Sequence, residues 1–103
     1  MHKLVLAATA TLILAGCTWV QLTTGGAAVR LATVNEVANC TRVGRALVNT
    51  MSKVTFVERG GDKQQNELIT LARNEGADLG GNVVVAETTI NQGEQTFGVY
   101  RCP

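Results

Sequence analysis

The sequence predicts a small α+β domain: a mainly antiparallel sheet of three to four strands, with one helix packed on one face and one disulfide. Three observations lead to this class. Short strand-like segments come first, one long segment with helical spacing follows, and two further strand-like segments close the chain. Such an order buries apolar surface by laying the helix across the sheet.

The strands expected before the helix are short. Residues 28–31 alternate apolar and polar side chains and predict the first strand. Residues 40–50, rich in Val and Thr, predict the second, in which Gly44 marks a bulge. Residues 53–56 alternate again and predict either an extension of that strand or a short third one.

The helix is predicted from about Lys63 to Leu79. Asp62 is the expected N-cap, with Gln65 as its capping-box partner, and Gly60-Gly61 forms a turn before it. Gly80-Gly81 supplies the left-handed stop. The residues expected on or near the apolar face are Leu68, Ile69, Leu71, Ala72, Gly76 and Leu79, with Glu75 as a polar exception.

Two strands joined by a tight turn are predicted after the helix. Residues 82–90 contain three consecutive valines and indicate a buried strand, and residues 91–93 (Asn-Gln-Gly) are typical of a hairpin turn. Residues 96–102 form the predicted final strand. Its two faces would carry Phe97 and Val99 on one side and Tyr100 and Cys102 on the other.

The N-terminus has the form of a lipoprotein precursor. A short positive segment precedes the uncharged apolar stretch 4–14, which is too short for a membrane span of about 20 residues but suits a signal-peptide core. Residues 14–17 read Leu-Ala-Gly-Cys, which resembles a bacterial lipobox. We therefore expect residues 1–16 to be a lipoprotein signal peptide and Cys17 to carry lipid. An ordinary secretory peptide followed by a chance Cys is the alternative.

Residues 17–26 are expected to form the lipidated N-terminus and a short tether with a turn at Gly25-Gly26, and residues 27–103 a single domain. Thr18 stands where Asp signals inner-membrane retention in Gram-negative lipoproteins. By analogy it predicts anchoring in the outer membrane, on its periplasmic face. Trp19 would lie either at the headgroup boundary or against the domain.

Cys40 and Cys102 are the two cysteines left once Cys17 carries lipid. An even pair in an oxidising compartment predicts a disulfide, which would stabilise the domain by about 4 kcal/mol for a loop of this length. Two free thiols, or a mixed disulfide with a partner, are the alternatives.

Charge and composition exclude several function classes. The chain has nine Lys and Arg against eight Asp and Glu, and only Lys3 lies in the removed segment, so the remaining charges balance and nucleic-acid binding is not expected. The only His is His2, also removed, so a Ser-His-Asp or Cys-His site is not expected. We predict no enzyme activity, no cofactor and no metal site.

Polar residues of the predicted helix offer the few candidates for a site. Arg73, Asn74 and Glu75 form the densest polar patch, which is either a solvent-facing stretch or a candidate partner surface. Glu67, Glu75 and Asp78 could serve acid–base chemistry or hold Ca²⁺, although a solvated helix face is the expected role.

The chain resembles a family of small lipoproteins of unknown function from enterobacteria and related Gram-negative bacteria. The resemblance rests on the lipobox, on residues 22–30, on Cys40 with Val43-Gly44, on residues 71–84 and on the ending 98–103. That family is distantly similar to the envelope stress sensor RcsF, a disulfide-bonded α+β lipoprotein. RcsF has four domain cysteines and a long Pro-rich linker, whereas this chain has two cysteines and a short tether.

These observations predict a non-enzymatic lipoprotein of the cell envelope that binds another protein, as a stress sensor or accessory module. Its partners would be the membrane, through Cys17, and an envelope protein of unknown identity. The alternative is a periplasmic module that binds a small ligand or a metal ion.

Overall fold

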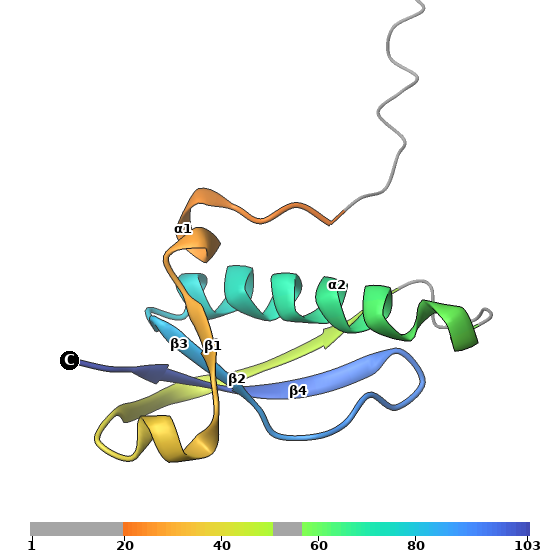
Figure 1. Ribbon diagram of the computed structural model, residues 1–103. Helices are drawn as coiled ribbons and strands as arrows, with labels where there is room; N and C mark the ends of the chain where they lie inside the picture. The colour runs from red at the N-terminus through yellow and green to blue at the C-terminus, as the bar shows by residue number, and fades with distance from the viewer. Residues whose placement is uncertain (1–19, 51–56) are drawn as a thin grey trace, which may run out of the picture.

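The computed structural model describes residues 20–50 and 57–103, so the predictions for Cys17, Trp19 and residues 53–56 lie outside the described residues. Within these ranges the chain forms a four-stranded sheet with one long helix on one face, which confirms the α+β class (Figure 1). The elements are α1 (Thr24–Ala27), β1 (Arg30–Ala32), the 3-10 helix η2 (Val34–Val37), β2 (Thr41–Asn49), α2 (Val57–Asp78), β3 (Val83–Ala86) and β4 (Glu94–Arg101).

The sheet has the order β1-β3-β4-β2 and is mixed. β4, the last strand in the chain, lies in the middle and pairs antiparallel with both β3 and β2. β1 pairs parallel with β3, with Leu31 opposite Val84. The sheet is thus mainly antiparallel, with one parallel pair at its edge.

The predicted bulge in β2 is confirmed. Arg42 lies opposite Tyr100, while Gly44 lies opposite the next residue, Val99, so that Val43 is the extra residue on β2. Beyond the bulge Ala46 and Val48 are buried, whereas the side chain of Leu47 between them is 63% exposed. β2 therefore presents an apolar face to the helix. The side of the sheet away from α2, on which Leu47 lies, is called the open face.

The hairpin turn at residues 91–93 is also confirmed. Gln92 and Gly93 both have positive φ, 52° and 80°, which is the conformation of a two-residue type I′ turn. The backbone N–H of Asn91 donates to Glu94 O at 2.9 Å, and that of Glu94 donates to Asn91 O at 3.0 Å. This turn leads the chain into β4.

The predicted start of the long helix is wrong. α2 begins at Val57, so Gly60-Gly61 lies inside the helix and Asp62 is not its N-cap. Gly costs a helix only about 1 kcal/mol per residue relative to Ala, which packing of a 22-residue helix on a sheet readily offsets. Gln65 makes no capping box; its Nε2 donates to Gln95 Oε1 of β4 at 2.7 Å.

The predicted end of the helix is confirmed. Gly80 has φ +88°, its N–H donates to Ala77 O, and Gly81 N–H donates to Gly76 O at 2.9 Å. These two bonds form a Schellman motif, which satisfies the last carbonyl groups of α2. Leu79, expected on the apolar face, is 40% exposed because the helix ends one residue before it.

The core lies between α2 and the sheet. Its buried members are Val29, Ala46, Val48, Leu68, Ala72, Val84, Phe97 and Val99. A smaller cluster on the other face of the sheet contains Ala32, Val37, Val83 and Val85, with Tyr100, Cys40 and Cys102 packed against it. The two predicted faces of the last strand are therefore confirmed.

The predicted disulfide joins Cys40, just before β2, to Cys102, just after β4. Because β2 and β4 are hydrogen-bonded neighbours, with Thr41 opposite Arg101, the two cysteines meet at the same end of the sheet. Their Cα atoms are 4.4 Å apart, within the usual range for a disulfide.

Glu36 is the residue whose ionisation supports local structure at η2. Its Oε1 accepts hydrogen bonds from the backbone N–H of Thr33 at 2.9 Å and from Thr33 Oγ1 at 3.3 Å. Both bonds lower the pKa of Glu36 below its ordinary value; the bond from the backbone has the larger effect and that from the hydroxyl the next. The charge of Arg30 acts in the same direction.

Because the pKa of Glu36 is lower in the folded state, the ionised carboxylate stabilises η2 at every pH above the unfolded-state pKa of Glu36. This support is lost as pH falls through the folded-state pKa. We expect NMR titration to give Glu36 a midpoint below that of Glu in an unstructured peptide, with the Thr33 amide shift following the same curve. Glu36→Gln should remove that pH dependence from the Thr33 amide, and an ordinary midpoint for Glu36 would contradict the capping contact.

Candidate functional site

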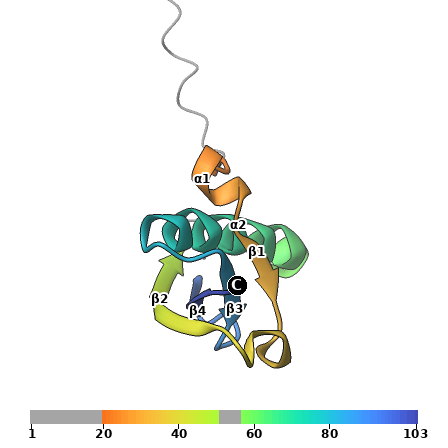
Figure 2. The same cartoon turned by 90° about the vertical axis from the view of Figure 1, so that its left-hand side faces the viewer.

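The candidate site is the contact between α2 and the N-terminal arm, which we define as residues 20–29. The arm runs along the side of α2 that faces away from the sheet, and α1 lies on the same side (Figures 1 and 2). α2 therefore lies between the arm and the sheet. Residues 20–26, expected to be part of a tether, are instead placed against the helix.

Asn74 holds the first part of the arm. Its Oδ1 accepts hydrogen bonds from the backbone N–H of Thr23 at 2.9 Å and from Thr23 Oγ1 at 3.0 Å. Its Nδ2 donates to the carbonyl oxygen of Gln21 at 3.0 Å. One amide side chain thus fixes the backbone of two residues that are more than 50 positions away in the sequence.

Arg73 holds the last part of the arm. Its Nε donates to the carbonyl oxygen of Val29 at 2.6 Å, and its Nη2 donates to that of Ala27 at 3.4 Å. Val29 is fully buried in the core and directly precedes β1. Arg73 therefore ties the arm to the point at which the chain enters the sheet.

Two glycines let α1 approach α2. A Cβ at Gly26 would collide with Asn74 Oδ1, and one at Gly25 would lie 3.2 Å from the Cβ of Ala77. Thr23 caps α1, with its Oγ1 accepting from the Gly26 N–H at 2.9 Å. The predicted turn at Gly25-Gly26 is therefore wrong; both residues belong to α1, where the absence of a side chain permits the close packing.

The three residues of the predicted surface patch, Arg73, Asn74 and Glu75, differ in burial and in what they bind. The first two are half-buried and bonded to the arm, whereas Glu75 is exposed. The sequence did not reveal the role of Gln21, Thr23 and Gly26 at this contact. No local pattern could have done so, because their partners lie in α2, far along the chain.

Of the carboxylates proposed for acid–base chemistry, Glu67 is half-buried, and its Oε1 accepts from Thr50 Oγ1 at 2.8 Å. Glu75 and Asp78 are exposed. Within residues 20–50 and 57–103, no three side chains of the His, Cys, Asp and Glu types are placed so that they could hold a metal ion. In the same part of the chain, no helix has the length and apolarity needed to cross a membrane.

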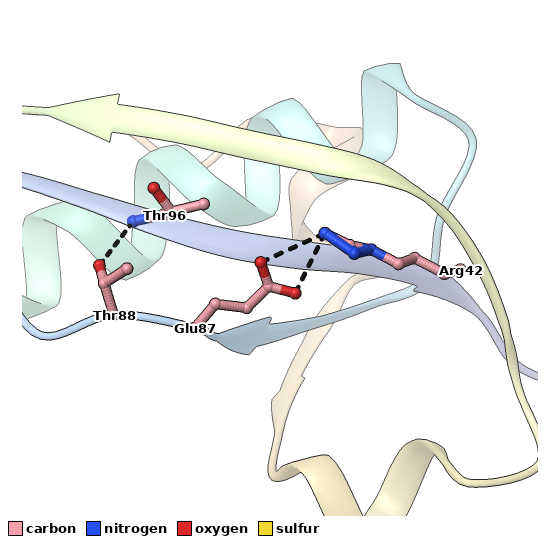
Figure 3. A network of polar contacts seen from close by, with 4 residues as sticks. All are labelled: Arg42, Glu87, Thr88 and Thr96. Carbon is pink, nitrogen blue, oxygen red and sulfur yellow. Dashed lines mark hydrogen bonds and ion pairs between the residues drawn. The ribbon is translucent and has the colours of Figure 1, made fainter.

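The opposite face of the sheet carries a charged network (Figure 3). Arg42 Nη2 lies 3.1 Å from Glu87 Oε2 and donates to Glu87 Oε1 at 3.2 Å. The carboxylate of Glu87 lies directly over Gly98, and a Cβ atom at Gly98 would collide with it. The ion pair is partly exposed, and such pairs contribute at most about 1 kcal/mol to stability.

Asn74→Ala should release the first part of the arm without unfolding the domain. Three hydrogen bonds are lost, each worth about 0.5–1.5 kcal/mol, and their exposed partners on the arm can bond to water. We expect faster amide hydrogen exchange at Thr23 and a small drop in the urea midpoint. Glu75→Ala, on the adjacent exposed position, is the matched control and should change neither. Unchanged exchange at Thr23 in Asn74→Ala would show that these bonds do not hold the arm.

Comparison with known proteins identifies one family. Residues 20–102 match the family described as Domain of unknown function (DUF4156). No curated protein and no solved structure matches the chain. The matched segment includes the arm, α2 and all four strands of the described sheet. Because it covers most of the 103 residues, the chain belongs to this family of unknown function.

Proposed function

We propose that this protein is a lipid-anchored component of a bacterial envelope that acts by binding another envelope protein, as a sensor or accessory subunit. The observation that carries the proposal is the Leu-Ala-Gly-Cys motif at residues 14–17, after an uncharged apolar segment of signal-peptide length. A Cys bearing several acyl chains gives firm membrane attachment, which one chain alone does not.

Three further observations support this proposal. The domain begins close behind the motif, since the arm contacts α2 from Gln21 onward. A disulfide between Cys40 and Cys102 suits an oxidising compartment. The charges of residues 17–103 balance and the only His lies at position 2, which supports a binding role over nucleic-acid recognition or His-based catalysis.

Cys17→Ala tests the anchor. In a Gram-negative host, the unaltered protein should appear in the membrane fraction with a lipid-modified Cys17 as its first residue in mass spectrometry. Without the thiol there is no site for the diacylglycerol, so Cys17→Ala should lose the lipid and either keep residues 1–16 or appear in the soluble fraction. An unmodified, uncleaved N-terminus on the unaltered protein would refute the proposal.

Thr18→Asp is the matched control for location. It leaves the thiol and the domain intact, so the variant should still carry lipid. By analogy with Gram-negative lipoproteins, it should move from the outer to the inner membrane in density fractionation. Crosslinking in intact cells should then trap a specific partner for the unaltered protein, and repeated absence of any specific adduct would count against a protein-binding role.

A further inference from the structure

We propose that the N-terminal arm and the outer side of α2 rest against a phospholipid bilayer, so that the open face of the sheet points away from the membrane. This inference rests on the lipidation of Cys17 proposed above. The surface concerned comprises the arm and, on α2, the positions around Thr70 and Asn74, which are four residues apart and share one side of the helix.

The length of the connecting chain is the first argument. Cys17 is three residues before Val20, and three residues span at most about 11 Å when fully extended. The lipid-bearing residue must therefore lie within this distance of the start of the arm. The domain cannot stand far from the bilayer whatever the conformation of the link.

The attachment of the arm is the second argument. Asn74 fixes Gln21 and Thr23, and Arg73 fixes Val29, so the arm is held to α2 at both ends. The chain consequently leaves the domain on the side of α2 that is remote from the sheet (Figures 1 and 2). A helix with its side chains is about 10–12 Å across, and α2 lies between the start of the arm and the sheet.

The composition of the arm is the third argument. Residues 20–29 contain no charged side chain, and Leu22 within the arm is 40% exposed. The arm, as an uncharged segment with an exposed Leu, can approach the headgroup boundary without a desolvation cost for charged groups of its own, whereas the outer side of α2 carries Lys63 and Glu67. The open face of the sheet carries the charges of Arg42, Arg45 and Glu87, which favour water, beside the exposed Leu47.

Spin labelling of the full-length, lipidated protein tests this orientation. Cys17 is blocked by its lipid and Cys40 is paired with Cys102, so an introduced Cys is the only reactive thiol. Thr70→Cys places a nitroxide on the outer side of α2, and Leu47→Cys places one on the open face of the sheet, as the matched control. Both proteins are reconstituted in vesicles of phosphatidylethanolamine and phosphatidylglycerol that contain a lipid with a gadolinium chelate on its headgroup.

We expect the gadolinium lipid to increase the relaxation rate of the label at residue 70 several-fold more than that at residue 47. Asn66→Cys, at an exposed position one turn before Thr70 on α2, provides a second label position if Thr70→Cys lowers the yield of folded protein. Adding Asn74→Ala should reduce the difference, because the first part of the arm is then no longer held to α2, whereas Glu75→Ala should leave it unchanged.

Equal relaxation at residues 70 and 47, or a stronger effect at residue 47, would overturn the orientation. Mass spectrometry of the same samples separates this failure from that of the proposed function. A lipidated Cys17 with equal relaxation refutes the orientation alone, whereas an unmodified Cys17 refutes the anchor and the orientation with it.

Discussion

Cys40→Ala is expected to lower the free energy of unfolding by about 4 kcal/mol. The disulfide closes a loop with a sequence separation of 62, and the unfolded chain regains the entropy of this loop once the bond is lost. For a domain of this size the loss corresponds to a fall in melting temperature on the order of 15–30 °C. Thermal and urea unfolding followed by far-ultraviolet circular dichroism measure both quantities.

Cys102→Ala and the double variant are the controls for this prediction. All three variants lack the same covalent bond, so they should have similar unfolding free energies if the disulfide is the cause. Thiol counting on the unfolded protein purified under oxidising conditions should find no reactive thiol among Cys40 and Cys102. An unchanged melting temperature in Cys40→Ala would show that the bond contributes nothing to stability.

Phe97→Ala is expected to cost about 3–5 kcal/mol of stability. The Phe97 side chain is fully buried on β4, in the middle of the sheet, where it packs with residues from α2 and the neighbouring strands. Its removal leaves a cavity that the surrounding side chains fill only in part. Because a small domain has a total stability of about 5–15 kcal/mol, urea unfolding should show a much lower midpoint or no folded baseline.

Leu47→Ala is the matched control for this substitution. Leu47 lies on the adjacent strand, next to the residue that faces Phe97, but its side chain is 63% exposed. Its truncation should change the unfolding free energy by less than about 0.5 kcal/mol. A similar cost for both substitutions would mean that the buried cluster is not where the fold gains its stability.

Elements with strong local signals could be predicted from the sequence. The Asn-Gln-Gly turn, the run of valines in β3 and the glycine stop at Gly80 each determine a backbone conformation through neighbouring residues alone. The pairing of Cys40 with Cys102 followed from counting the cysteines and from the oxidising compartment that the lipobox-like motif predicts. These features need no knowledge of distant contacts.

The parts that the sequence could not reveal depend on tertiary contacts. Gly60-Gly61 favours a turn when judged locally, but the long helix continues through it. Arg73 and Asn74 read as solvent-facing polar residues, because nothing near them in the sequence shows that the arm binds there. The sequence did not predict the parallel pairing of β1 with β3 for the same reason, since half of the chain separates these two strands in the sequence.

The central position of β4 determines when the domain can fold. Within the described sheet β2 pairs with β4 alone, and β3 is connected to β2 only through β4, the strand that comes last in the sequence of these elements. A polypeptide whose synthesis has not yet reached β4 therefore cannot complete its core, because β2 and β3 lack the strand that lies between them.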